Sequence, residues 1–199
     1  MSTFNPYVVT NVQDGFSVQS QGYWQGDLQD DPAGRFQLAA GIVAAAETLP
    51  MWGGIAVFEK TPPATPDATP MGSIIGRATG SDTLAGFSVF NGVYSAPTTP
   101  QSPVPLQSVG GGFNFVRLGT KNRVVVKCAS SILALAGSEN PKSLGWDVTN
   151  QQLVAAGAGD FDFTATLIDV NTNGATVVYD GVTGFATWNT VSNVAVILI

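Results

Sequence analysis

Hydrophobic and polar residues alternate along residues 160–167 with the two-residue period of a β-strand. In the stretch DFDFTATL, Phe161, Phe163, Ala165 and Leu167 occupy one set of alternate positions, and polar residues occupy the other. Successive side chains of a strand point to opposite faces of its sheet. The pattern therefore predicts a strand with one face buried.

A second alternating stretch is RVVVKC at residues 123–128. Val124, Val126 and Cys128 would share one face, while the two basic residues and the middle valine share the other. Because Cys128 alternates with valines, we interpret it as a small core residue.

Shorter apolar runs lie between glycines and prolines, at residues 39–47, 53–59, 85–94, 112–118 and 194–199. Short runs bounded by breakers are typical of buried strands. The first, AAGIVAAAE, is rich in alanine, the best helix former. Its glycine interrupts that pattern, so we expect a strand or a single helical turn there.

Two dipeptides predict turns near the end of the chain. Asn173-Gly174 is a strong signal for a two-residue hairpin turn, and Asp180-Gly181 is a second one. The apolar residues just before the first turn have the opposite parity to those at 161–167. We therefore expect either a β-bulge near Leu167 or a hairpin that is apolar on both faces.

These elements predict an all-β protein of about ten short strands, arranged as a β-sandwich or a jelly-roll-like barrel. Residues 1–34 have no sustained period and predict an extended N-terminal arm, and residues 35–199 form a single β domain. Two long proline-rich loops, at 61–72 and 96–106, interrupt the domain, because proline cannot donate to a sheet ladder.

Composition narrows the classes of partner. Charged residues make up 11% of the 199 residues, where about 25% is usual. A low-charge, neutral-polar surface suits a protein covered by neighbours, and a secreted β-sandwich is the alternative. The net charge of −6 with eight basic residues argues against nucleic acid, because phosphate binding depends on Lys and Arg.

The sequence favours no catalytic site, cofactor or metal. It contains no histidine, the commonest general base and zinc ligand, and its one cysteine cannot form an internal disulfide. A carboxylate glycosidase needs only two acids, and a calcium site needs oxygen ligands, so acids remain candidates for both. They are Glu47, Glu59, Asp147, Asp160 and Asp162.

The first residues show neither a basic region nor an apolar region of the signal-peptide type. No apolar run approaches the roughly 18 residues of a membrane-spanning helix. We therefore expect synthesis in a bacterial cytoplasm and no membrane partner.

Half of the basic residues fall within eleven positions, as Arg117, Lys121, Arg123 and Lys127. A basic strip on an acidic protein is a candidate dock for an acidic partner surface. The alternative is that these charges protect an exposed edge strand from aggregation.

Tryptophans are the other candidate partner contacts. Trp24 and Trp146 lie in glycine-rich stretches and are expected to be exposed, where they could contact a partner or stack on sugar rings. Trp52 and Trp188 lie in or beside apolar strands and are expected in the core.

Three stretches resemble the decoration, or cement, proteins of tailed-bacteriophage heads: ETLPMWGGIAVFE, GWDVTNQQLVAAG and GVTGFATWNTVSNVAVILI. The resemblance covers Phe36–Phe58 and Gly119–Ile199. It implies a β-sandwich or jelly-roll-like protein of the virion exterior that stabilises the shell by bridging capsomers. The implied partners are the major capsid protein and further copies of the chain, as a homodimer or homotrimer. A viral or bacterial glycan-binding adhesin or tail component is the alternative.

Overall fold

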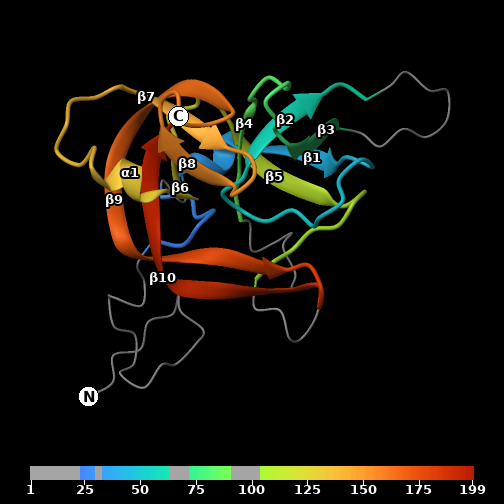
Figure 1. The fold of residues 1–199 in the computed structure, drawn as a ribbon. Helices are drawn as coiled ribbons and strands as arrows, with labels where there is room; N and C mark the ends of the chain where they lie inside the picture. Colours follow the sequence, from blue (N-terminus) through green and yellow to red (C-terminus); the bar gives the residue numbers. More distant parts are fainter. Residues whose placement is uncertain (1–22, 30–32, 63–71, 91–103) are drawn as a thin grey trace, which may run out of the picture.

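The computed structural model describes residues 23–29, 33–62, 72–90 and 104–199, and their regular structure is almost entirely β. Two five-stranded sheets pack side by side, and the last two strands form a long ribbon that curves beneath them (Figure 1). The predicted all-β class is confirmed.

The first sheet is a closed barrel. Its strands, in order around the barrel, are β1 (Ala39–Val43), β3 (Ser73–Arg77), β2 (Ala56–Lys60), β4 (Gly86–Ser88) and β5 (Gly112–Arg117). Only β1 and β3 run parallel, and β5 pairs with β1 to close the ring. The first half of the alanine-rich stretch at residues 39–47 is therefore a strand, which was one of the two structures expected there.

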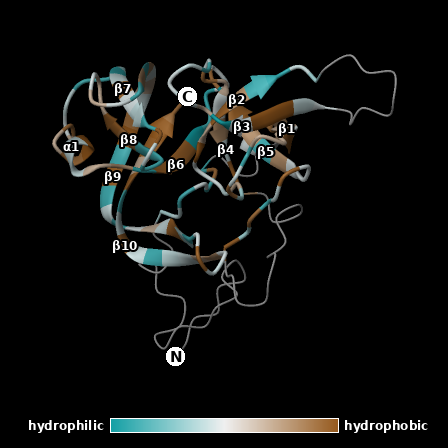
Figure 2. Ribbon diagram, turned by 45° about the vertical axis from the view of Figure 1, so that its right-hand side comes forward, coloured by the Kyte–Doolittle hydropathy of each residue, from teal (hydrophilic) through white to brown (hydrophobic). Residues whose placement is uncertain are grey.

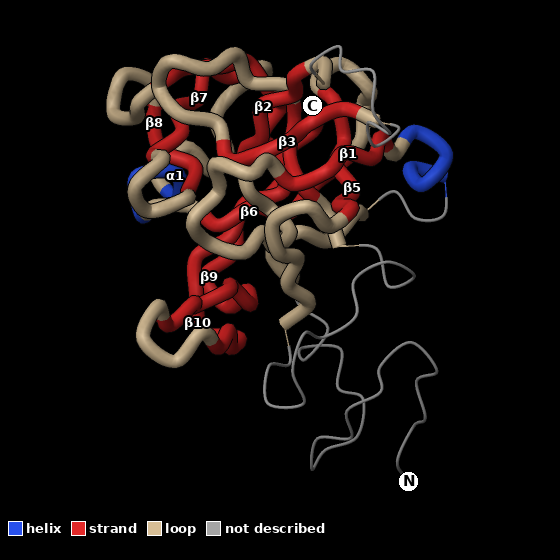
Figure 3. The backbone as a smooth tube through the Cα atoms, turned by 90° about the vertical axis from the view of Figure 1, so that its right-hand side faces the viewer, coloured by secondary structure: helices blue, strands red, loops and turns tan. Residues whose placement is uncertain are grey.

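The second sheet is antiparallel. Its strands, in order, are β6 (Arg123–Lys127), β10 (Phe185–Leu198), β9 (Phe161–Asp180), β7 (Lys142–Asp147) and β8 (Gln152–Ala155). The short helices η2 (Ala33–Gln37) and α1 (Ser130–Leu133) lie on opposite sides of the body (Figure 3). Among the described helices, none is long and apolar enough to cross a membrane.

Alternation along the barrel strands divides the core. Val57 and Phe115 belong to a cluster that includes the barrel interior, whereas Phe87 and Val116 face the second sheet. There Phe87 makes an edge-on contact with Trp146, with 5.3 Å between ring centroids. Figure 2 shows hydrophobic residues concentrated on the strands of the body, while much of the curved ribbon is hydrophilic or intermediate. The largest apolar cluster thus joins the two sheets.

The predicted alternation in β6 and β9 is confirmed. Cys128 is buried and unpaired in the same cluster as Val124 and Val126. In β9, Leu167 pairs with Ile197 and Asp169 pairs with Val196, which leaves one extra residue between them. This register shift is the β-bulge that the sequence offered as one of two possibilities.

The hairpin predicted at Asn173-Gly174 is wrong. Both residues lie inside β9, and the chain reverses instead at 181–184. Register shifts in the pairing with β10 fall between Asn189 and Val194, where the ribbon bends. A Cβ on Gly174 would lie 2.2 Å from Val194 Cγ2, so glycine permits close packing at this bend rather than a two-residue turn.

The last residues of the predicted arm that the structure describes pack on the β domain. Residues 23–29 form bridges to β6 and β9, and Leu28 is buried against Val124. Residues 1–22 lie outside the described part of the chain, as do 63–71 and 91–103, which hold most of the two proline-rich segments. The end of the second segment is core, because Val104 and Leu106 are buried.

Candidate functional site

The four basic residues do not form one continuous strip. Arg117 ends β5 and makes a bidentate ion pair with Glu59, at 2.8 and 2.7 Å. This pairing is the main reason that the pKa of Glu59 lies below its ordinary value. One member of the predicted strip is therefore neutralised by an acid that sits on β2.

The other three basic residues lie on and beside β6. Lys121 is exposed in the turn before β6, and Arg123 and Lys127 occupy the two ends of the strand. Lys127 Nζ donates to the carbonyl of Asn150 at 3.2 Å. Edge protection is wrong as an explanation, because β6 pairs with β10 on one side and with residues 23–29 on the other.

The predicted exposure of Trp146 is wrong. Its side chain has no accessible surface, because β7 places it between Phe87 and the hydrophobic residues of the second sheet. Trp24 is partly buried and contacts Trp188 edge-on, with centroids 4.7 Å apart. Trp52 is buried as predicted. Only Trp24 of the two candidates reaches the surface.

The candidate acids are held by hydrogen bonds within the chain. Asp147 and Asp160 accept from backbone amides of the turn at 148–150, and Asp162 accepts from Gly157. Glu47 and Glu59 are paired with arginines. No group of three or more metal-ligating side chains occurs among the described residues. These acids therefore fix local structure.

A concave site, which we call the hairpin pocket, lies where the end of the β9–β10 ribbon meets the barrel. Its volume is about 320 Å³. It is lined by residues 47–50 between β1 and β2, by Leu106, Ser108 and Val109 before β5, and by Tyr179 and Gly184 of the ribbon. Three separate parts of the chain thus build it.

Arg77 of β3 holds the first wall of the hairpin pocket in place. Its guanidinium donates to Glu47 Oε2 at 2.8 Å and to the carbonyls of Leu49 and Pro50 at 3.0 and 2.5 Å. Its backbone amide donates to Glu47 Oε1 at 2.7 Å. Burial lowers the pKa of Arg77 from its ordinary value. Its charge is thus directed into the protein.

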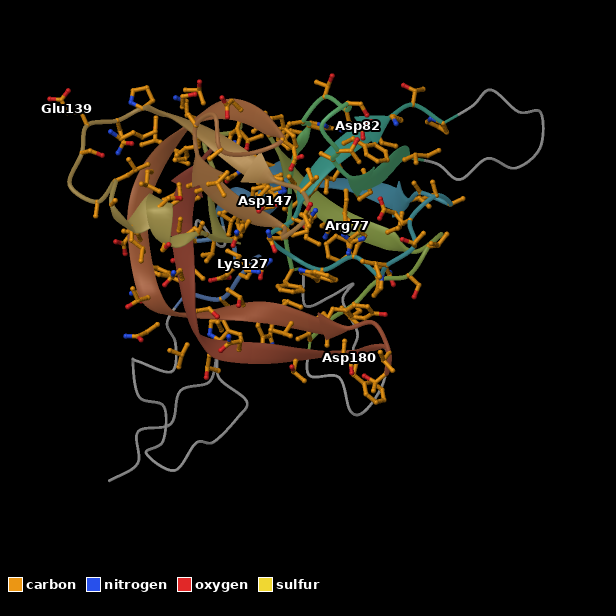
Figure 4. The ribbon with its side chains drawn as sticks, in the orientation of Figure 1. Arg77, Asp82, Lys127, Glu139, Asp147 and Asp180 are labelled. Carbon is orange, nitrogen blue, oxygen red and sulfur yellow. The ribbon has the colours of Figure 1, made fainter. Side chains whose placement is uncertain are left out.

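Aromatic stacking fixes the opposite wall. Tyr179 stacks on Trp52 with ring centroids 5.9 Å apart, and the Arg77 guanidinium lies 4.8 Å from the Trp52 ring. Val177 and Ala186 of the ribbon are buried in the same cluster. The end of the ribbon is therefore docked on the barrel. Figure 4 shows Asp180 at this end, below Arg77.

Two of the residues that line the hairpin pocket are exposed apolar residues, and a third exposed apolar residue lies in the ribbon turn between the lining residues Tyr179 and Gly184. Leu49 is 42% exposed, Val109 is 48% exposed, and Val182 at the turn of the ribbon is 95% exposed. Val182 has the highest exposure among the large apolar residues that the structure describes. The sequence analysis missed this site, although a valine at the centre of the turn DGVTG was a usable signal.

A second, more open cavity of about 450 Å³ lies between β6, β8 and β10. Cys128 lines it, but burial raises the pKa of this thiol to about 12. The thiolate form that acts as a nucleophile or soft metal ligand is therefore disfavoured at neutral pH. Ala129, Val191 and five polar residues form the rest of the lining.

The chain was compared with protein-family models, with curated proteins and with solved structures, and none of the three comparisons found a match.

Proposed function

We propose that this chain is a structural virion protein that binds the outer surface of a bacteriophage capsid and stabilises the shell by bridging capsomers. Its partners are the major capsid protein and further copies of itself, as a homodimer or homotrimer. It is made in the bacterial cytoplasm and acts on the capsid exterior without turnover.

The observation that carries the proposal is the exposure of large apolar side chains on two separate projections. Phe36 on η2 is 91% exposed and Val182 at the ribbon end is 95% exposed. The helix η2 and the turn of the β9–β10 ribbon lie on different sides of the molecule (Figure 3). Bridging requires two contact points on one subunit, and exposed apolar groups favour contacts with protein surfaces.

Two further features support this reading. Each of the five candidate acids is engaged in a hydrogen bond or an ion pair within the chain. The low charge of the chain reduces the cost of removing ions from water at each contact. Many weak contacts repeated over a lattice then give strong overall binding.

Co-sedimentation with capsids assembled without this protein tests the proposal. We expect the purified chain to sediment with expanded heads at a saturating, fixed ratio and to raise the temperature at which the heads release DNA. Unexpanded heads serve as the control and should bind little. A chain that stays in the supernatant with expanded heads contradicts the proposal.

Glycan binding, the alternative function, is supported by only one of its two candidate tryptophans. Trp24 is partly exposed, but Trp146 is not available to a sugar. A glycan array on which the wild type binds and Trp24→Ala does not would favour the adhesin reading. Trp146→Ala is unsuitable for that test because it would open a cavity in the core.

A further inference from the structure

Several exposed apolar residues lie close together at the hairpin pocket. Leu49 and Val109 lie on its two barrel walls, and Val182 lies between the ribbon residues that form its third wall. A fully exposed valine in a tight turn has no role in the core of its own chain. Apolar groups around a concave centre are the arrangement found at protein contact sites.

The charges near this mouth are negative. No lysine or arginine is among the described residues that line the hairpin pocket, and Arg77 is 12% exposed with its donors turned inward. Asp180 is exposed, and its carboxylate accepts from the Val182 amide at 2.9 Å and from Thr183 Oγ1 at 2.7 Å. These bonds hold an anion beside the exposed valine.

We propose that the hairpin pocket, with Val182 and Asp180 at its edge, is the surface that docks on the capsid protein. It takes a surface segment that carries an apolar side chain beside a lysine or arginine. The apolar group enters between Leu49 and Val109, and the cation pairs with Asp180. This inference rests on the proposed function and names the part of the chain that performs it.

The chain offers a matched pair of variants for the test. Val182 and Val191 are both exposed valines, at 95% and 72%, but Val191 lies at the other cavity, away from the hairpin pocket. Binding of Val182→Asp and Val191→Asp to heads lacking this protein should be measured by co-sedimentation. Circular dichroism and light scattering on each variant report folding and oligomeric state.

We expect Val182→Asp to weaken binding by at least about tenfold, because it puts a charge into an apolar contact, and Val191→Asp by less than about twofold, because Val191 lies outside the docking surface. Asp180→Asn keeps an acceptor for the turn but removes the charge. Asp180→Asn should weaken binding to heads at low salt. The affinity of this variant should also depend less on salt than that of the wild type, because the attraction that salt screens is absent.

Each other outcome is decisive. Equal binding by Val182→Asp and the wild type overturns the inference but leaves the proposed function standing. Equal losses for the two valine variants overturn the choice of site. A Val182→Asp variant that binds heads normally but changes its oligomeric mass shows that a second copy occupies the surface, which also overturns the inference. Failure of the wild type to bind removes the proposed function and this inference together.

Discussion

Arg77 and Glu47 form an ion pair in which each side chain is 12% exposed, and the pair connects β3 to the chain that leads out of β1. Arg117 and Glu59 form a second pair, but Arg117 is 53% exposed. Both are arginine–glutamate pairs, and they differ in burial. Comparing them therefore shows how burial changes the contribution of an ion pair to stability.

Arg77→Gln should lower the free energy of unfolding by about 3 kcal/mol, because it leaves the largely buried carboxylate of Glu47 without its cation and with only the backbone amide of residue 77 as a donor. Arg117→Gln should cost less than about 1 kcal/mol, since solvent screens the exposed pair. Urea unfolding measures both. Equal losses would show that burial of the Arg77 pair does not matter for stability.

Gln25→Ala should destabilise the protein by about 2 kcal/mol. Gln25 is buried, and its Oε1 accepts from the backbone amide of Val177 at 2.9 Å, so alanine leaves that amide unpaired. Gln29→Ala is the control, because the side chain of Gln29 donates to the exposed carboxylate of Asp27 rather than to a buried group. Thermal unfolding that does not distinguish the two variants would place residues 23–29 outside the cooperative unit.

Gly174→Ala should cost about 1–3 kcal/mol, because the new methyl group would overlap the Val194 side chain. Gly181→Ala is the matched control, since nothing lies within 4 Å of a Cβ built there. Adding Val194→Ala should offset part of the loss at position 174. Strict additivity of the two substitutions in urea unfolding would refute the steric explanation.

Stability should fall in acid, and Glu59 should contribute to the fall. The hydrogen bonds from Arg117 lower the pKa of Glu59 below its ordinary 4.5, so the unfolded chain takes up this proton at a higher pH than the folded chain does. The stabilisation is complete above the unfolded pKa and is lost as the pH falls through the folded pKa. Glu59→Gln should therefore show a shallower decline in urea midpoint below about pH 4.5 than the wild type. Identical slopes would exclude Glu59 from the effect.

Local patterns were sufficient for strands whose two faces differ in polarity. β6 and the first half of β9 alternate cleanly, so their faces and the core position of Cys128 could be predicted, and a bulge near Leu167 was one of two possibilities. This was possible because the two-residue period of a strand depends only on residues that are adjacent in the chain.

Features that depend on distant parts of the chain were not predictable in this way. Trp146 follows a glycine and looks like a turn residue, but it is buried by Phe87, which comes from the other sheet. Gly174 follows an asparagine and looks like a hairpin turn, but its neighbour across the ribbon, Val194, determines its role. The hairpin pocket likewise needs three segments that are far apart in the chain.

The position of β10 between β6 and β9 has a consequence for biosynthesis. The five strands of the barrel are complete once residue 117 has been made, whereas the other sheet lacks the strand that joins β6 to β9 until the ribosome has translated residues 185–198. Nascent chains therefore expose part of the apolar face that carries Phe87 and Val116 while translation continues. A premature stop codon before residue 185 would yield a fragment in which β6 and β9 lack the strand between them, and such unpaired strand edges favour aggregation.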